Sequence, residues 1–372
     1  MHKVKIHTLF EYLLETTEAA PEAFIGFSLA EPPTLGDYLG DLDPGLSLDW
    51  NNQSFRGLPA LRRNVLARSG LAGHCAEDDV LITAGAAEAN YLALRQLVSP
   101  GQKIVTESPG WPQVGVLAKA IGAELVEVPR IEREGWALPL ERLAEAARGA
   151  TLIFLTNPNN PTGRLIPEPE LREIVEIAQR EGAWLLVDEV YAGLEWAGPR
   201  PPSVAGLYEK GITTGSVSKA LGLQGLRTGW LICHDKDMVM DAVILRENAS
   251  EIMNIMGEVI AEIALREDRY TAKLATVRAA ALNTLEMLDH FVETEPRLSW
   301  QKPEAGLIGL ARLDGLDGDT FARQLLAEPY RTFLLPGSAY GQPGHIRIGV
   351  GGGAASNLEL GLSRMSALLA TL

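Results

Sequence analysis

Short runs of apolar and β-branched residues alternate with longer amphipathic segments between residues 80 and 234. Such alternation is typical of strands separated by helices, and it predicts an α/β sheet. Several runs are apolar on both faces, which favours a mostly parallel sheet covered by helices on each side. The seven predicted strands are VLIT (80–83), KIVTE (103–107), ELVEV (124–128), TLIFLT (151–156), AWLLVD (183–188), GITTGSVS (211–218) and TGWLICH (228–234).

The last two predicted strands are joined only by the segment KALGLQGLR. This connection is too short for a helical crossover, so one of the two strands is expected to run antiparallel. After residue 234 the pattern predicts a long helical region over 236–290 and a closing helix from about 356. Shorter β-like pieces lie between them, at 307–313, 332–337 and 345–350.

This change of pattern predicts three parts of the chain. The first 45 residues are rich in Pro, Gly and acidic side chains, and we expect an arm that packs on a smaller domain or on a partner subunit. The expected parts are the arm (1–45), a large domain (46–255) and a smaller α+β domain (256–372).

Composition narrows the possible classes of function. The chain has 372 residues, with 46% hydrophobic and 22% charged residues, which is ordinary for a globular protein. Its net charge of −15 disfavours binding to nucleic acids and to anionic membranes. No apolar run approaches the roughly 20 residues that a membrane-spanning helix needs.

The number of cysteines indicates in which cellular compartment the protein is expected. Cys75 and Cys233 are the only cysteines, which excludes a disulfide framework and a four-cysteine metal site. Three glutamates interrupt any apolar stretch within the first twenty residues, so no secretory signal is expected there. We therefore expect a cytoplasmic protein with free thiols and no metal.

Polar side chains follow the predicted strands, where ligands bind in open α/β sheets. A turn of small residues, Gly85-Ala86-Ala87-Glu88, opens a helix whose free N–H groups can hold a phosphate. Asp188 ends an apolar strand, and a buried carboxylate needs a cationic partner. The other segments of this kind are Asn157-Pro158-Asn159-Asn160-Pro161-Thr162-Gly163, Asp188-Glu189-Val190-Tyr191, and Ser216-Val217-Ser218-Lys219 followed by Arg227.

Together these segments resemble the signature of class I/II aminotransferases, which are fold-type I enzymes of pyridoxal 5′-phosphate (PLP). The resemblance covers nearly the whole chain, and Arg347 in HIRIGVG matches the carboxylate-binding arginine of the family. It implies an aspartate aminotransferase-like fold and a homodimer. It also implies a reaction at the Cα of a free L-amino acid, whose amino group passes to a 2-oxo acid.

The resemblance also implies a role for each matching residue. Lys219 would form the Schiff base with PLP and act as general base, and Asp188 would pair with the ring nitrogen. Asn160 and Tyr191 would donate to the ring oxygen, although Asn160 could also merely shape its turn. Trp111 would stack on the cofactor, unless it is a core residue. The phosphate would be held by Ser216, Ser218, Arg227 and the backbone of Ala86 and Ala87.

One position departs from the family pattern. The family carries a Tyr five residues before the glycine of a G-x-x-x-L-R segment, where this chain has Asn52 before Gly57.

The arm is also similar to that of a branch with PLP enzymes acting on arginine derivatives, such as capreomycidine synthase and enduracididine cyclases. In that branch an acidic arm residue meets the substrate side chain, and here Glu11 matches it, with Ser28 and Glu31 nearby.

Two mechanisms therefore remain open. The first is transamination. The second is elimination and ring closure on a hydroxyarginine-like substrate. Glu11 and Glu31 would favour a basic substrate side chain, unless Glu11 is simply a solvated helix residue. A regulatory domain that only senses PLP is disfavoured, because the arm is too short and too acidic for a helix-turn-helix domain.

Overall fold

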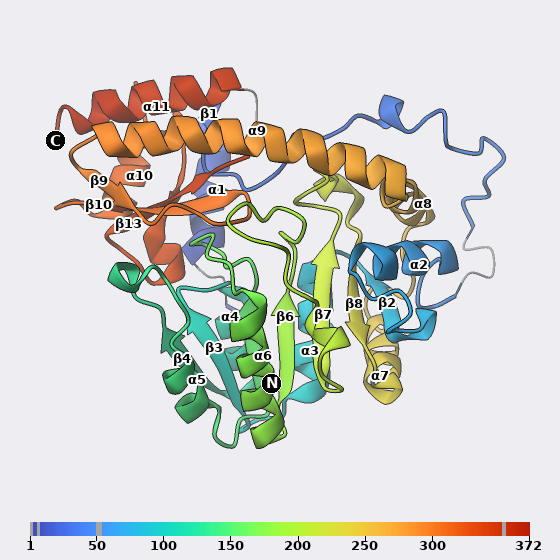
Figure 1. Cartoon of the computed structure of the whole chain (residues 1–372). Coiled ribbons are helices and arrows are strands. Elements are labelled where there is room, and N and C mark those ends of the chain that lie inside the picture. Colours follow the sequence, from blue (N-terminus) through green and yellow to red (C-terminus); the bar gives the residue numbers. More distant parts are fainter. Residues whose placement is uncertain (1–2, 6–7, 50–53, 352–354) are drawn as a thin grey trace.

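The computed structural model of the chain describes residues 3–5, 8–49, 54–351 and 355–372. Its centre is a seven-stranded sheet with the order β2-β8-β7-β6-β5-β3-β4 (Figure 1), which confirms the predicted α/β sheet. Strand β8 pairs antiparallel with β2 and β7, and the remaining pairs are parallel. The strands are β2 (Val80–Thr83), β3 (Lys103–Ser108), β4 (Glu124–Pro129), β5 (Leu152–Thr156), β6 (Trp184–Asp188), β7 (Gly211–Ser216) and β8 (Gly229–Cys233).

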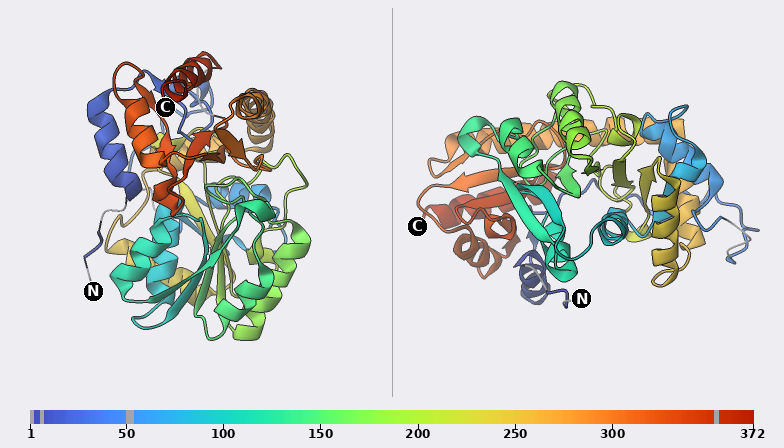
Figure 2. Two further views of the ribbon diagram at one scale, coloured as in Figure 1. Left: turned by 90° about the vertical axis from the view of Figure 1, so that its left-hand side faces the viewer. Right: turned by 90° about the horizontal axis from the view of Figure 1, so that it is seen from below.

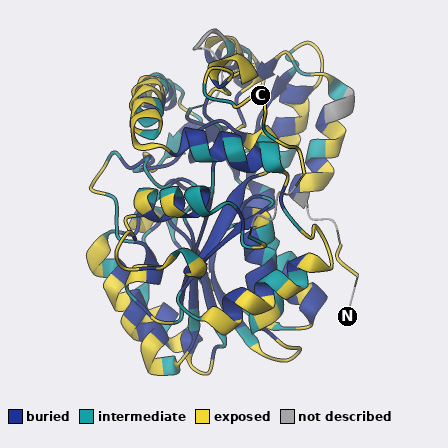
Figure 3. Cartoon of the chain, turned by 90° about the vertical axis from the view of Figure 1, so that its right-hand side faces the viewer, coloured by how far each residue is buried: buried dark blue, intermediate teal, exposed yellow. Residues whose placement is uncertain are grey.

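Helices cover both faces of this sheet, as the apolar runs predict. In β5, Leu152 and Phe154 pack in one cluster with α3, α4 and α7, whereas Ile153 and Leu155 pack in another with α5 and α6. All strands of this sheet except the edge strand β4 are accordingly buried on both faces (Figure 3). The helices are α3 (Ala86–Leu97), α4 (Gln113–Ile121), α5 (Leu140–Ala147), α6 (Glu168–Glu181) and α7 (Lys236–Glu247).

The predicted helical region over 236–290 is divided into three helices. Helix α7 is followed by α8 (Ile255–Ala264) and by the long α9 (Glu267–Thr294). The side chain of Asn254 caps α8 by accepting from the amide of Gly257, which fixes a new helix start there. Helix α8 packs with α2 (Pro59–Arg68) beside β2, and α9 extends along the molecule toward the C-terminal elements (Figure 1).

The C-terminal part contains a second sheet with the order β12-β13-β10-β9. The sequence pattern predicted β10 (Ile308–Leu313), β13 (His345–Gly349) and α11 (Ala355–Leu369), but missed β9 (Leu298–Trp300) and α10 (Gly318–Leu326). The predicted run at 332–337 is split into β11 (Thr332–Phe333) and β12 (Leu335–Pro336), which join different sheets.

The N-terminal segment packs against these C-terminal elements (Figure 2). It forms α1 (Thr8–Ala19) and β1 (Ala23–Phe24), and β1 pairs parallel with β11. The hydroxyl of Tyr12 donates to the backbone oxygen of Ala322 at 3.3 Å. Within a single chain the N-terminal segment therefore contacts the C-terminal elements.

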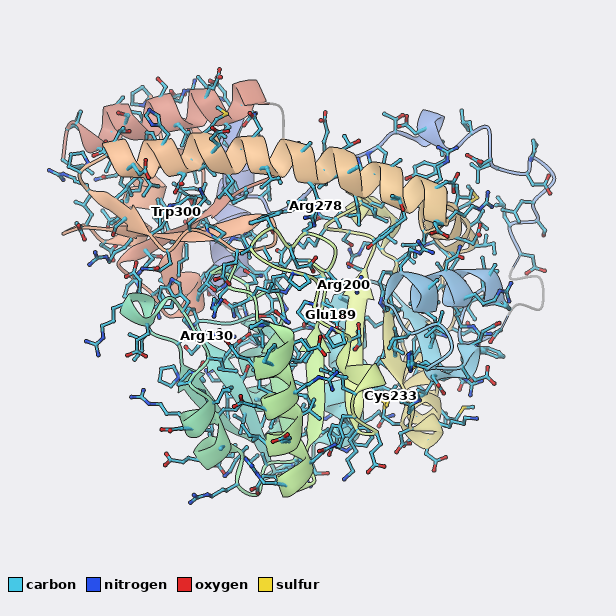
Figure 4. The ribbon with its side chains drawn as sticks, viewed as in Figure 1. Arg130, Glu189, Arg200, Cys233, Arg278 and Trp300 are labelled. Atoms are coloured by element: carbon cyan, nitrogen blue, oxygen red, sulfur yellow. The ribbon has the colours of Figure 1, made fainter. Side chains whose placement is uncertain are left out.

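Two further expectations concern composition. Within the described ranges, no helix combines the length and the apolar character required to cross a membrane. Cys75 and Cys233 are both free and buried. Cys233 ends β8, away from the carboxyl ends of the parallel strands (Figure 4).

Candidate active site

The carboxyl ends of the parallel strands open into a cavity of about 650 Å³ between the sheet, the arm and the C-terminal elements. This volume is within the range of ligand-binding pockets. The cavity brings together twelve of the fourteen site residues that the sequence predicts, all except Glu11 and Glu31. These twelve are Ser28, Ala86, Ala87, Trp111, Asn160, Asp188, Tyr191, Ser216, Ser218, Lys219, Arg227 and Arg347.

Lys219 lies in the connection between β7 and β8, with its amine at the cavity. Its Nζ donates to the hydroxyl of Ser28 at 3.4 Å. Removal from water lowers the pKa of Lys219 to about 8, and the positive charges of Arg347 and Arg227 act in the same direction. A lysine with such a pKa has a larger unprotonated fraction near neutral pH, as a nucleophile or a general base requires.

Asp188 is buried at the end of β6 and accepts two hydrogen bonds. One comes from Asn90 Nδ2 at 2.8 Å and the other from the amide of Val190 at 3.2 Å. Burial raises the pKa of Asp188 to about 6, although these hydrogen bonds and Lys219 oppose the rise. Lys219 is the only cation among the described groups that lower the pKa of Asp188, so a further cationic group in the cavity would relieve the cost of its charge.

Asn90 is a site residue that sequence reasoning missed. It lies on α3, and its Oδ1 accepts from the hydroxyl of Thr214 at 2.8 Å. This bond orients the amide so that its Nδ2 faces Asp188. The one available signal is a polar residue on the buried face of an amphipathic helix, four residues after Ala86.

Tyr191 and Ser28 form a second polar pair beside Lys219. The Tyr191 hydroxyl donates to Ser28 Oγ at 2.9 Å, and burial raises the pKa of Tyr191 to about 12. Tyr191 is therefore a proton donor over the whole neutral range. Ser28 was predicted near the substrate side chain, but the structure places it between the tyrosine hydroxyl and the lysine amine.

Arg347 is buried at the wall of the cavity. Its Nη1 donates to Asn160 Oδ1 at 3.2 Å and to the Tyr340 hydroxyl at 2.6 Å, and its Nη2 donates to the backbone oxygen of Gly26 at 2.9 Å. Its Nε is buried without a hydrogen-bond partner among the described residues. A guanidinium held in this way retains capacity for a carboxylate from outside.

The start of α3 and the β7–β8 connection form a cradle of donors. Gly85 has φ +85° and ψ 168°, a backbone conformation that residues with a Cβ rarely adopt, and a Cβ at Gly229 would lie 2.5 Å from the backbone carbon of Gly85, so glycines let the start of α3 approach β8. Arg227 faces the first turn of α3, where Ala86 and Ala87 present free amides, and Ser216 and Ser218 lie on the same side. Guanidinium, hydroxyl and helix N-terminal amides together suit a phosphate group.

Trp111 is held at the cavity wall by a glutamine. Its Nε1 donates to Gln113 Oε1 at 3.1 Å, and Gln113 Nε2 donates to the backbone oxygen of Ala87 at 2.7 Å. The indole is half-buried and lines the cavity, which disagrees with a purely core position.

A buried ion pair supports the loop that carries Asn160. Arg130 and Glu107 are 2.6 Å apart and fully buried, and Arg130 is labelled in Figure 4. Glu107 Oε1 accepts from both the amide and the hydroxyl of Thr156, and Thr156 Oγ1 accepts from the Asn160 amide at 3.3 Å. Sequence reasoning missed this pair, although Glu107 stands out as a charge within an apolar strand.

Glu11 and Glu31 are the two predicted site residues that do not reach the cavity. Both are exposed. Helix α1 turns Leu9, Phe10 and Leu13 toward the cavity, and the helical spacing then directs Glu11 to solvent. Within a single chain neither carboxylate therefore lines the cavity, and their contact with the substrate stays a prediction. Asn52, the departure from the family pattern, lies outside the described residues.

Comparisons with known proteins identify the family of the chain. The family model described as aminotransferase class I and II matches residues 51–365. The chain is 27% identical over 379 residues to an aspartate aminotransferase from Streptomyces avermitilis, covering 95% of this chain and 90% of the relative. It is 28% identical over 349 residues to the capreomycidine synthase of Streptomyces vinaceus, covering 91% and 87%.

A solved structure shows the same architecture. It is a PLP-dependent aminotransferase from Streptococcus suis, with a TM-score of 0.91 and 27% identity, and the match covers 100% of this chain and 99% of that one. The predicted fold-type I architecture is confirmed by this likeness.

Proposed function

The chain belongs to the aminotransferase class I and II family, and from this premise we propose that it transfers the amino group of a free L-amino acid to a 2-oxo acid. It is a PLP-dependent enzyme. One observation carries the proposal: a single cavity holds Lys219, the buried Asp188 and the buried Arg347.

The residues present fit this cofactor. Asp188 supplies the buried carboxylate that a protonated ring nitrogen needs, and the cradle at Gly85 and Arg227 suits its phosphate. Lys219 would bind the cofactor aldehyde as a Schiff base, Trp111 would cover the ring, and Asn160 would bond to the ring oxygen. When bound, PLP supplies an electron sink for the bonds at the substrate Cα.

The remaining steps belong to side chains of this chain. Arg347 binds the α-carboxylate of the substrate and fixes the orientation of its Cα. Lys219 Nζ takes the proton from Cα, which its lowered pKa favours. Ser28 and Tyr191 hold the amine in place through the hydrogen bonds at 3.4 and 2.9 Å.

The test is a cofactor-loaded preparation incubated with an amino acid and a 2-oxo acid. We expect a new amino acid and a new oxo acid in equal amounts, and loss of both products in Lys219→Ala. Borohydride reduction and peptide mapping should place the cofactor on Lys219. A label on another lysine would contradict the assignment.

Elimination followed by ring closure is a second candidate. Two features favour it: the similarity to capreomycidine synthase over 91% of this chain, and Asn52 at the position where the family carries a tyrosine. Mass spectrometry separates the two reactions. Elimination releases one water from a hydroxylated substrate without an amino acceptor, whereas transamination requires the acceptor.

We also propose a homodimer in the cytoplasm. Residues 35–49 protrude from the body of the molecule (Figure 1), and Leu35, Leu39 and Leu48 are 57%, 60% and 73% exposed there. A second copy would cover these side chains. The two free, buried thiols support a reducing compartment. Sedimentation velocity should give a dimer, and an active monomer would contradict the proposal.

A further inference from the structure

The part of the cavity wall formed by the arm is apolar. Helix α1 contributes three side chains, and the segment after β1 and strand β12 contribute the others. These residues come from separate segments, so their convergence follows from the packing of the arm against the C-terminal sheet. The apolar wall consists of Leu9, Phe10, Leu13, Phe27, Leu29 and Leu335.

The charged side chains that line the cavity already have roles in the proposed function. They are Asp188, Lys219, Arg227 and Arg347. In that function Asp188 and Arg227 would hold cofactor groups, Lys219 would be the base, and Arg347 would bind the α-carboxylate. Among the described residues, no further carboxylate lines the cavity for a cationic side chain, and no further cation lines it for an acidic one.

Within one chain, this balance of charge favours an uncharged substrate side chain. A charged side chain placed against the apolar wall would lose water without gaining a partner, which is strongly unfavourable. An apolar side chain gains from leaving water at the same place, roughly in proportion to the area it buries. The wall therefore selects against both basic and acidic amino acids.

We propose that the substrate is an amino acid with a large apolar side chain of the leucine, methionine or phenylalanine kind, selected by α1 and Phe27. This inference rests on the proposed function. Leu9 and Leu13 are one turn apart on α1, with Phe10 beside them at the mouth. Phe27 is held by a ring contact of 4.8 Å to Phe333, so this side of the wall is anchored to the C-terminal part.

The first test measures binding without chemistry. Unreactive carboxylates that mimic the substrate are titrated into the cofactor-loaded protein by calorimetry: 3-phenylpropanoate and 4-methylpentanoate against glutarate and 5-guanidinopentanoate. We expect the apolar pair to bind at least about ten-fold more tightly. Tighter binding of either charged compound would overturn the inference.

The second test is a kinetic panel of amino acids with a common 2-oxo acid. We expect kcat/KM for leucine or phenylalanine to exceed that for arginine, lysine, aspartate and glutamate by about ten-fold or more. Turnover of charged substrates alone would overturn the substrate class and leave the proposed function standing. Absence of any amino transfer across the whole panel would instead contradict the proposed function.

Substitutions on α1 test the wall itself. Phe10 is 52% exposed, so Phe10→Glu should fold, and it places a carboxylate at the mouth of the cavity. We expect it to lower kcat/KM for phenylalanine and raise it for arginine, with Leu13→Glu acting in the same direction. Leu14 is 63% exposed and outside the cavity, so Leu14→Glu is the matched control. Equal effects of Phe10→Glu and Leu14→Glu would overturn the assignment of α1.

Discussion

Asn90 controls the charge of Asp188, and its removal gives a prediction with a calculable size. Asp188 accepts two hydrogen bonds, and Asn90→Ala deletes the shorter one, at 2.8 Å. A hydrogen bond to a charged group contributes about 1.5–3 kcal/mol. Since the lost bond stabilised only the ionised form, the pKa of Asp188 should rise further, by about one to two units.

The expected consequence is a loss of activity that depends on pH. The ionised carboxylate is the form that holds a protonated ring nitrogen. A rise of its pKa from about 6 by about one to two units lowers the ionised fraction at pH 7 about two- to ten-fold, so kcat/KM should fall by about the same factor. The acid limb of the pH profile should move to higher pH by the same one to two units. The assay is kcat/KM for one amino acid measured from about pH 5 to 9 with saturating cofactor.

Two further variants are compared with Asn90→Ala, one with a smaller expected loss of activity and one as a control. Thr214→Val removes the hydroxyl that orients the Asn90 amide, a neutral hydrogen bond of about 0.5–1.5 kcal/mol, so its effect should be smaller. Asn64→Ala removes an amide on α2 that bonds to Glu262, away from the cavity, and serves as the control. The reasoning is refuted if Asn90→Ala keeps its acid limb where the wild-type protein has it.

The remaining predictions concern three other cavity residues. Burial lowers the pKa of Lys219 from 10.5 to about 8, so its ammonium costs the folded apoprotein stability at neutral pH, and the cost fades as pH rises toward 10.5. Lys219→Met should therefore raise the free energy of unfolding of the apoprotein at pH 7 by up to about 3 kcal/mol, and by less near pH 10, measured by urea denaturation. Ser28→Ala should lower kcat by about ten-fold with little change in KM, because the Lys219 amine and the Tyr191 hydroxyl both lose their hydrogen-bond partner. An increase in KM without a change in kcat would instead indicate that Ser28 binds the substrate. Arg347→Gln should lower kcat/KM by about a hundred-fold for every amino acid alike. If the ranking of amino acids by kcat/KM changes, Arg347 also contacts the substrate side chain.

The residues that line the cavity at the strand ends were predictable because strand ends and family motifs lie close together in the sequence. Asp188 directly follows an apolar run, and Lys219 lies eight residues before Arg227. A parallel sheet brings such strand ends to one edge whatever the details of packing. The antiparallel strand β8 was predictable for the same reason, since a short connection leaves no other geometry.

The supporting residues were not predictable, because their partners are distant in the sequence. Asn90 meets Asp188 across 98 positions, and Glu107 meets Thr156 across 49. Strand β9 and the division of 332–337 between two sheets likewise depend on which segments pair in space. A local pattern carries no information about such partners.

The sequence by itself determined the sheet, the order of its strands along the chain, and the residues at the carboxyl edge, because hydrophobic periodicity and short connections are local properties. Only the tertiary structure decided what faces the substrate side chain. Glu11 is next to Phe10 in the sequence, yet the turn of α1 against the C-terminal sheet directs Phe10 to the cavity and Glu11 to solvent. Helix rotation is set by which apolar face finds a core to pack on, and that core is assembled from segments hundreds of residues away.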